Sequence, residues 1–142
     1  MDSRFLSQPN IPALVYGAIA FTILYLLSSV GLSSFVNWWY APIPPDDLPE
    51  RIVSSWPWRI FGWSIYLIPG FIAGFVARRS GLMHGAIVGA LTAPIMAVFV
   101  YVMGFWSNVE TSSLIYGLVL GLVWCSIAGL IGQLVAFKLW RK

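Results

Sequence analysis

Residues 60–102 read IFGWSIYLIPGFIAGFVARRSGLMHGAIVGALTAPIMAVFVYV, and this segment shows most clearly the pattern from which the architecture can be predicted. Two runs without Asp, Glu, Lys or Arg, 60–77 and 80–109, meet there at Arg78 and Arg79, and similar runs cover 5–45 and 111–137. A helix needs about 20 apolar residues to cross the hydrocarbon layer of a bilayer. Because a backbone in lipid finds hydrogen-bond partners only within its own helix, the sequence predicts an all-α membrane protein. We expect a four-transmembrane-helix antiparallel bundle, and two tandem helical hairpins are one way to build it.

The boundaries of the spans follow from caps and charges. We expect a single integral membrane domain over 1–142, with spans at about 12–36, 58–77, 82–106 and 112–139 and an extracytoplasmic loop at 37–57. Asn10 is a suitable helix cap, and Pro12 falls in the first turn, where its missing N–H costs nothing. Of the 142 residues, 59% are apolar and 9% are charged, whereas soluble domains have about 25% charged residues. The net charge of +3 favours a lipid bilayer as the partner and no nucleic acid.

Orientation follows from the basic residues of the short connections. With a cytoplasmic N-terminus, Arg51 and Arg59 lie outside, and six basic residues lie inside: Arg4, Arg78, Arg79, Lys138, Arg141 and Lys142. Both termini are therefore predicted to be cytoplasmic. We expect Arg78, Arg79, Lys138, Arg141 and Lys142 to contact lipid headgroups.

Tryptophans gather at the predicted outer boundary. Six of the eight are expected there: Trp38, Trp39, Trp56, Trp58, Trp63 and Trp106. They fit an aromatic belt at the headgroup level, or a partner interface that docks another membrane subunit or a flat lipophilic ligand. Trp124 falls near the middle of the fourth span and is expected to pack inside the bundle or against a partner.

Small residues recur at helical spacing on three spans. Close approach at glycine is what lets helices pack in lipid, and the candidate packing residues are Gly70, Gly74, Gly85, Gly89, Gly117, Gly121 and Gly129. Gln133 is the polar residue that would cost most if left unpaired, so we expect it to make an interhelical contact. Across the turn at Arg78, we expect the second and third spans to pack on each other, with Gly74 against Gly85 or Gly89.

The stretch from Gly70 to Gly89 resembles a family of uncharacterised small bacterial membrane proteins with four helices. The matching residues are Gly70, Gly74, Ala77, Arg78, Gly81, His84, Gly85 and Gly89, about twenty positions of the chain in all. The resemblance implies a fold but no activity. We expect the protein in a bacterial plasma (inner) membrane. Residues 70–79 also align with 129–138, and 17–19 with 85–87, which suggests two hairpins related as a parallel repeat.

The spans lack the side chains that most catalytic mechanisms require. General acid–base catalysis uses carboxylates, His or Lys in a shielded site, and the spans carry none within the hydrocarbon, so we expect no catalytic residue and no enzyme. Asp46, Asp47 and Glu50 could form a cation site, but too few carboxylates are present and we predict no metal site. His84 is the one candidate ligand for a haem or chlorophyll, although a histidine at a helix end is more often a capping or headgroup residue. We predict no cofactor, while a bound lipid or pigment stays open.

Two functional hypotheses follow from these patterns. The first is a non-catalytic integral membrane subunit, an accessory protein that packs with partner membrane proteins or with itself as a homo-oligomer. The alternative is a small channel or carrier for a neutral or lipophilic substrate. Pro69 and Pro94, near the middle of the second and third spans, would expose backbone at a midplane site in a carrier, but we interpret them as kinks.

Overall fold

The computed structural model describes residues 9–39, 56–104 and 111–140, and these form four helices without a strand. They are α1 (Ile11–Trp39), α3 (Trp56–Ala77), α4 (Gly81–Val102) and α5 (Thr111–Leu139). Each contains a window long and apolar enough to cross a membrane. The protein is therefore a multi-pass integral membrane protein with an all-α, four-helix fold, as the uncharged runs predicted.

The helix bounds differ from the predicted spans by a few residues. Helix α1 continues to Trp39 rather than 36, and α3 begins at Trp56 rather than 58. Helix α4 ends at Val102 rather than 106, because Met103 is the C-cap and Gly104 has a positive φ of 76°. Most of the predicted outer loop, 40–55, and the connection at 105–110 lie outside the described residues.

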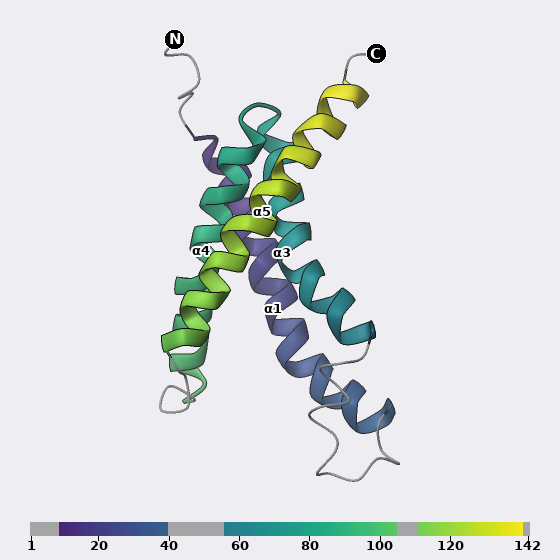
Figure 1. Ribbon diagram of the computed structural model, residues 1–142, viewed down its shortest axis with the longest axis vertical. Helices are drawn as coiled ribbons and strands as arrows, with labels where there is room; N and C mark the ends of the chain where they lie inside the picture. Colours follow the sequence, from purple (N-terminus) through teal and green to yellow (C-terminus); the bar gives the residue numbers. More distant parts are fainter. Residues whose placement is uncertain (1–8, 40–55, 105–110, 141–142) are drawn as a thin grey trace.

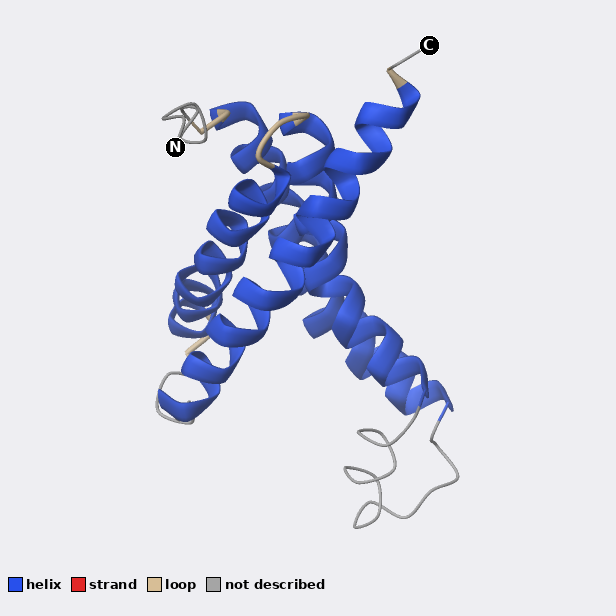
Figure 2. Ribbon diagram, turned by 45° about the horizontal axis from the view of Figure 1, so that its top comes forward, coloured by secondary structure: helices blue, strands red, loops and turns tan. Residues whose placement is uncertain are grey.

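The helices are arranged as two consecutive hairpins (Figure 1). Helices α1 and α3 form one, and α4 and α5 form the other. Helix α1 begins and α5 ends at the same end of the molecule, which we call the terminal end; towards the opposite, far end the hairpins diverge (Figures 1 and 2). In Figure 1, α3 and α5 cross in the half near the terminal end.

A tight turn joins the hairpins at the terminal end. Arg78 and Ser80 have positive φ angles of 58° and 53°, in the left-handed region that ends a helix and that non-glycine residues adopt at some cost. The N–H of Arg78 still donates to Gly74 O at 3.1 Å. Only three residues therefore separate the end of α3 from the start of α4, which runs back along the bundle.

The glycines of α3 and α4 pack on α5. A Cβ at Gly70 or Gly74 would collide with the backbone of Cys125 or Gly129, and one at Gly85 or Gly89 with the backbone of Cys125 or Gly121. The nearest neighbours of Gly74, Gly85 and Gly89 therefore lie on α5, which is closer to each of them than the predicted contact of Gly74 with Gly85 or Gly89 across the turn. Because α5 offers a continuous strip of small residues, backbones approach it from both sides; its buried residues are Gly117, Gly121, Cys125, Ala128, Gly129, Gly132 and Ala136.

Candidate functional site

Side chains from several helices meet at two places in the bundle. One group, the terminal cluster, comprises Asn10, Arg78, His84, Gln133 and Trp140. The other, the fork cluster, comprises Tyr25, Tyr66, Met96, Phe99 and Gly117, and it lies where the two hairpins begin to diverge.

His84 is the centre of the terminal cluster. Its ring is 2% exposed. Its Nδ1–H donates to Ser80 O at 2.9 Å, one turn earlier on α4, and its Nε2 accepts from the Asn10 N–H of α1 at 2.8 Å. This pair of partners requires the neutral ring with its proton on Nδ1, because a carbonyl can only accept and a backbone N–H can only donate.

Asn10 also starts α1, through hydrogen bonds that its two oxygen atoms accept. Its Oδ1 accepts from the Ala13 N–H at 3.4 Å, and its carbonyl accepts from Leu14 N at 3.2 Å. The predicted cap is confirmed. His84 is thus a capping residue, but for a helix from the other hairpin, and its burial makes the headgroup interpretation wrong. Ligation of a haem or chlorophyll would break one of the two bonds that hold α1 to α4.

Gln133 and Arg78 make contacts that connect the remaining helix ends. Gln133 Oε1 accepts from the Gly81 N–H at 2.6 Å, so α5 caps the first turn of α4, where backbone donors have no partner in their own helix. The Arg78 guanidinium lies 3.6 Å from the centroid of the Trp140 ring, in a cation–π arrangement that joins α3 to α5. The terminal cluster therefore fastens all four helices at one end.

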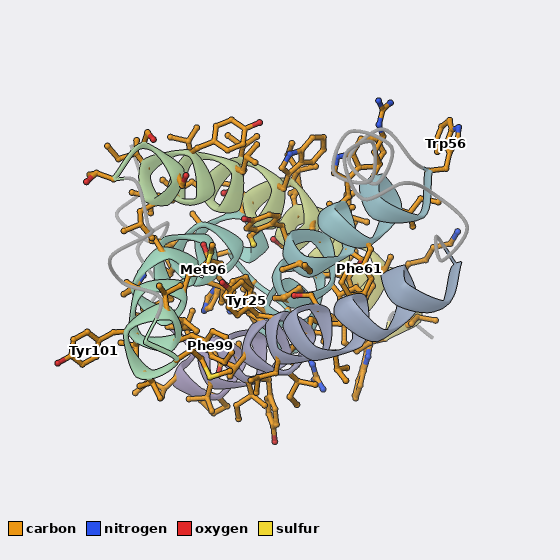
Figure 3. The ribbon with its side chains drawn as sticks, turned by 90° about the horizontal axis from the view of Figure 1, so that it is seen from below. Tyr25, Trp56, Phe61, Met96, Phe99 and Tyr101 are labelled. Carbon is orange, nitrogen blue, oxygen red and sulfur yellow. The ribbon has the colours of Figure 1, made fainter. Side chains whose placement is uncertain are left out.

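Aromatic rings form the fork cluster. Tyr25 stacks on Phe21 with centroids 5.8 Å apart and meets the edge of Phe99 at 5.2 Å, while Phe21 lies 6.2 Å from Tyr66. Figure 3, seen from the far end, shows Tyr25, Met96 and Phe99 together between the hairpins, whereas Trp56 and Tyr101 point away. The rings of α1, α3 and α4 therefore meet at the point of divergence.

Helix α5 completes the fork cluster through Gly117. A Cβ there would lie 3.6 Å from Met96 Sδ and 3.8 Å from Tyr66 Oη, which is ordinary contact. The Sγ of Cys125 donates to Tyr66 O at 3.0 Å. All four helices thus contribute a residue to the fork cluster.

The tyrosine hydroxyls of the fork cluster differ from the other hydroxyls of the spans. Five serines and threonines donate to carbonyls of their own helix: Thr22, Ser28, Ser64, Thr92 and Ser126. Within the described residues, Tyr25 and Tyr66 have no such hydrogen bond for their hydroxyls. No fully buried side-chain N or O atom of the described residues lacks a partner, so each of the two hydroxyls keeps some accessible surface.

The outer tryptophans occupy the far half of α3. Trp56 is 71% exposed and Trp63 is 50% exposed. One face of Trp63 is covered inside the chain, because its ring lies 6.3 Å from that of Trp124 on α5. This pair explains the half-buried Trp124. Trp106 and the side chains of Trp38, Trp39 and Trp58 lie outside the described residues.

Only some of the basic residues that were predicted to contact lipid headgroups are among the described residues. Arg78, Arg79 and Lys138 are exposed at the terminal end, and Arg141 and Lys142 lie outside the described residues.

In comparisons with protein-family models, curated proteins and solved structures, the chain shows no significant match to any of them.

The fork cluster was not predicted from the sequence. Tyr25 and Tyr66 are two of the six tyrosines of the chain, and neither has a motif around it. Their role depends on where α3 and α5 cross, which the local sequence does not encode. The one available signal was the position of both residues near the middle of a span, where a hydroxyl is costly.

Proposed function

We propose that this protein is a non-catalytic integral membrane subunit that works by packing with partner membrane proteins or with a second copy of itself. One observation carries the proposal. The imidazole of His84 and the amide oxygen of Gln133 are occupied at helix ends, and five Ser and Thr hydroxyls of the described spans bond back to their own helices. What these helices offer a neighbour is therefore mainly apolar and aromatic surface.

The far half of α3 is the surface best suited to a partner. Trp56, Ile60 and Trp63 are all exposed there, and the divergence of the hairpins leaves this half with fewer helix neighbours than the terminal half (Figure 1). Tryptophan is enriched among the residues that dominate binding energy at protein interfaces. A partner helix that packs here would supply the neighbours that this half of the hairpin lacks.

The cellular setting is part of the same proposal. We place the protein in a bacterial plasma (inner) membrane with both termini in the cytoplasm. Arg78, Arg79 and Lys138 all lie at the terminal end, and the bias of Lys and Arg towards cytoplasmic connections supports this direction. In this orientation Trp56 lies at the extracytoplasmic boundary.

The test of the association is the mass of the intact particle released from membranes in a mild detergent, for the parent and for Trp56→Ala. Because the Trp56 side chain is mostly exposed, its removal should leave the fold intact while weakening the complex. Tyr16→Ala is the matched control, since Tyr16 is a 57% exposed aromatic residue near the start of α1. A parent particle that contains a single copy of this chain and no other protein would contradict the proposal.

A small channel or carrier for a neutral or lipophilic substrate is the second candidate. The accessible hydroxyls of Tyr25 and Tyr66 favour it, because they give a substrate polar contacts within the apolar bundle. Purified protein in liposomes decides between the two functions. Solute movement that needs this chain alone, together with complexes unaffected by loss of Trp56, would replace the subunit by a carrier.

A further inference from the structure

The contact between α1 and α4 at the terminal end depends on the protonation state of one side chain. His84 is the one histidine of the chain, and its ring is 2% exposed. Its Nδ1–H donates to Ser80 O at 2.9 Å, and its Nε2 accepts from the Asn10 N–H at 2.8 Å. In a charged imidazole both nitrogens carry a proton and neither can accept. The hydrogen bond to Asn10 therefore forms only while the ring is neutral.

A second proton on His84 would break one of its two contacts and leave the other intact. An Nε2–H would point at the Asn10 N–H, so two donors would face each other, and a buried charge without a partner is costly. The Nδ1–H would still donate to Ser80 O, which precedes His84 by one turn of the same helix. The charged ring is therefore compatible with α4 itself but not with α1 in its observed position on α4.

The ionisable groups around His84 offer a second proton no compensation. At the terminal end these groups are Arg78 and Arg79 after α3 and Lys138 on α5, all of them cations. The ionisable side chains of α1 are tyrosines, and α4 has only Tyr101 besides His84. Residues 9–39, 56–104 and 111–140 contain no Asp or Glu, and Asp2 lies outside the described residues. Within the described part of the chain, a charged His84 has no carboxylate to pair with.

The movement of α1 would be confined to its first turns. Ile11 is 68% exposed, and Ala13 is buried in the contact with the bundle. The next close approach of α1 is at Gly17, where a Cβ would lie 2.7 Å from Val88 Cγ2 on α4 and 3.1 Å from Ala73 Cβ on α3. Residues 10–16 can therefore leave α4 while the remainder of α1 stays packed.

The other contacts of the terminal cluster are independent of mild acid. Gln133 accepts from the Gly81 N–H, and the Arg78 guanidinium lies on the Trp140 ring. Neither an amide nor a guanidinium changes its charge between about pH 5 and about pH 8. Acid would therefore act on the contact of α1 with α4 and leave α3, α4 and α5 fastened to one another.

We propose that His84 is a pH-sensitive switch that releases the start of α1 from α4 when its ring takes a second proton. The closed contact holds one proton on the ring and the released form holds two, so acidification favours release. A histidine in water gains its charge at about pH 6.5. If only the released form takes the second proton, the ratio of released to closed chains rises about thirtyfold between about pH 7.5 and about pH 5. The switch goes beyond the association proposed above and does not depend on it, because the contact lies within one chain.

The test is the mobility of a nitroxide spin label at Ile11→Cys, in a Cys125→Ala background and in lipid nanodiscs. The exposed position of Ile11 leaves room for the label, and its spectrum should gain a mobile component between about pH 7.5 and about pH 5. Ile19→Cys is the matched control, because Ile19 is 49% exposed on the same helix beyond Gly17, and a label there should not respond. His84→Gln keeps an acceptor for the Asn10 N–H at every pH, so it should remove the response at Ile11.

A second measurement follows the ring itself. Because the chain has one histidine, isotope-labelled histidine gives a single set of ring signals in nuclear magnetic resonance. They should show a proton on Nδ1 alone at about pH 7.5 and on both nitrogens at about pH 5, in step with the label at Ile11. Should His84→Gln fail to fold, as judged by its unfolding midpoint, the agreement between the ring and the label in the parent still decides.

Four results would overturn the proposal. They are a ring and a label that do not change down to about pH 5, a doubly protonated ring with an immobile label at Ile11, an equal response at Ile19, and the same response in folded His84→Gln. None of them would alter the particle mass by which the association is judged.

Discussion

Gly74 and Gly129 mark the closest approach of the α3 and α5 backbones. In Gly74→Ala, the new Cβ would lie 2.7 Å from Gly129 Cα and closer still to its carbonyl. Carbon atoms in contact are about 3.5–4.0 Å apart, so the two helices would have to separate by roughly 1 Å. The neighbouring approach of Gly70 to Cys125 would be lost with it.

Gly62→Ala on the same helix is the matched control. No atom lies within 4 Å of a Cβ placed at Gly62, so this variant gains helix propensity, up to about 1 kcal/mol, without a collision. The same gain applies to Gly74→Ala, and it cancels when the two variants are compared. Overpacking of a closely packed site costs about 1–3 kcal/mol, and Gly74→Ala should be less stable than Gly62→Ala by that amount.

The assay is reversible unfolding in mixed micelles, with increasing mole fraction of dodecyl sulfate and helix content followed by circular dichroism. The difference should appear as a lower midpoint for Gly74→Ala with an unchanged slope. If the two variants unfold at the same detergent fraction, α3 and α5 are not in backbone contact at Gly74, and the glycine strip of α5 would face lipid.

The remaining predictions concern the terminal cluster and the orientation. His84→Ala should lower stability by about 2–3 kcal/mol, because it empties a buried site and leaves the Asn10 N–H without its acceptor; His84→Gln, which can still accept, should lose less in the same assay. Gln133→Ala removes the acceptor of the Gly81 N–H and should cost about 1–2 kcal/mol, whereas Gln133→Glu should keep most of the stability. In a Cys125→Ala background, cysteine introduced at Ser55 should react with an impermeant reagent on intact cells and cysteine at Ser80 should not; the opposite labelling would reverse the orientation.

The uncharged runs determined most of the architecture. A run of apolar residues has no alternative to a helix in lipid, so the fold class and the helices followed directly, with ends displaced by only a few residues. The start of α1 could also be predicted from the sequence, because an Asn at a helix start caps the helix through purely local hydrogen bonds. Gln133 was predicted to contact another helix, and it does so through Gly81.

Which helices pack against each other could not be predicted from the sequence in the same way. A soluble helix shows its buried face as an apolar stripe. These helices are apolar on all faces, so no such stripe distinguishes the buried face. The glycines of α3 and α4 marked close approach correctly and yet gave no sign that α5 was the common partner. His84 was misjudged for a related reason: its Nε2 binds a residue 74 positions away, and no local pattern encodes that distance.

The crossing of α3 and α5 has a further implication for the origin of the fold. Gly70 and Gly129, the first residues of the aligned segments, are 59 positions apart, and so are Tyr66 and Cys125, which are hydrogen-bonded to each other. Positions that a repeat makes equivalent can contact each other only near the axis that relates the two copies. An axis along the membrane normal, as in parallel repeats, would place these two residues beside it and make the α3–α5 crossing the centre of a duplicated hairpin. The small residues of α3 and α5 would then derive from one ancestral packing surface. Their tight apposition explains why the two hairpins are fastened near the terminal end and are free to diverge beyond the fork cluster.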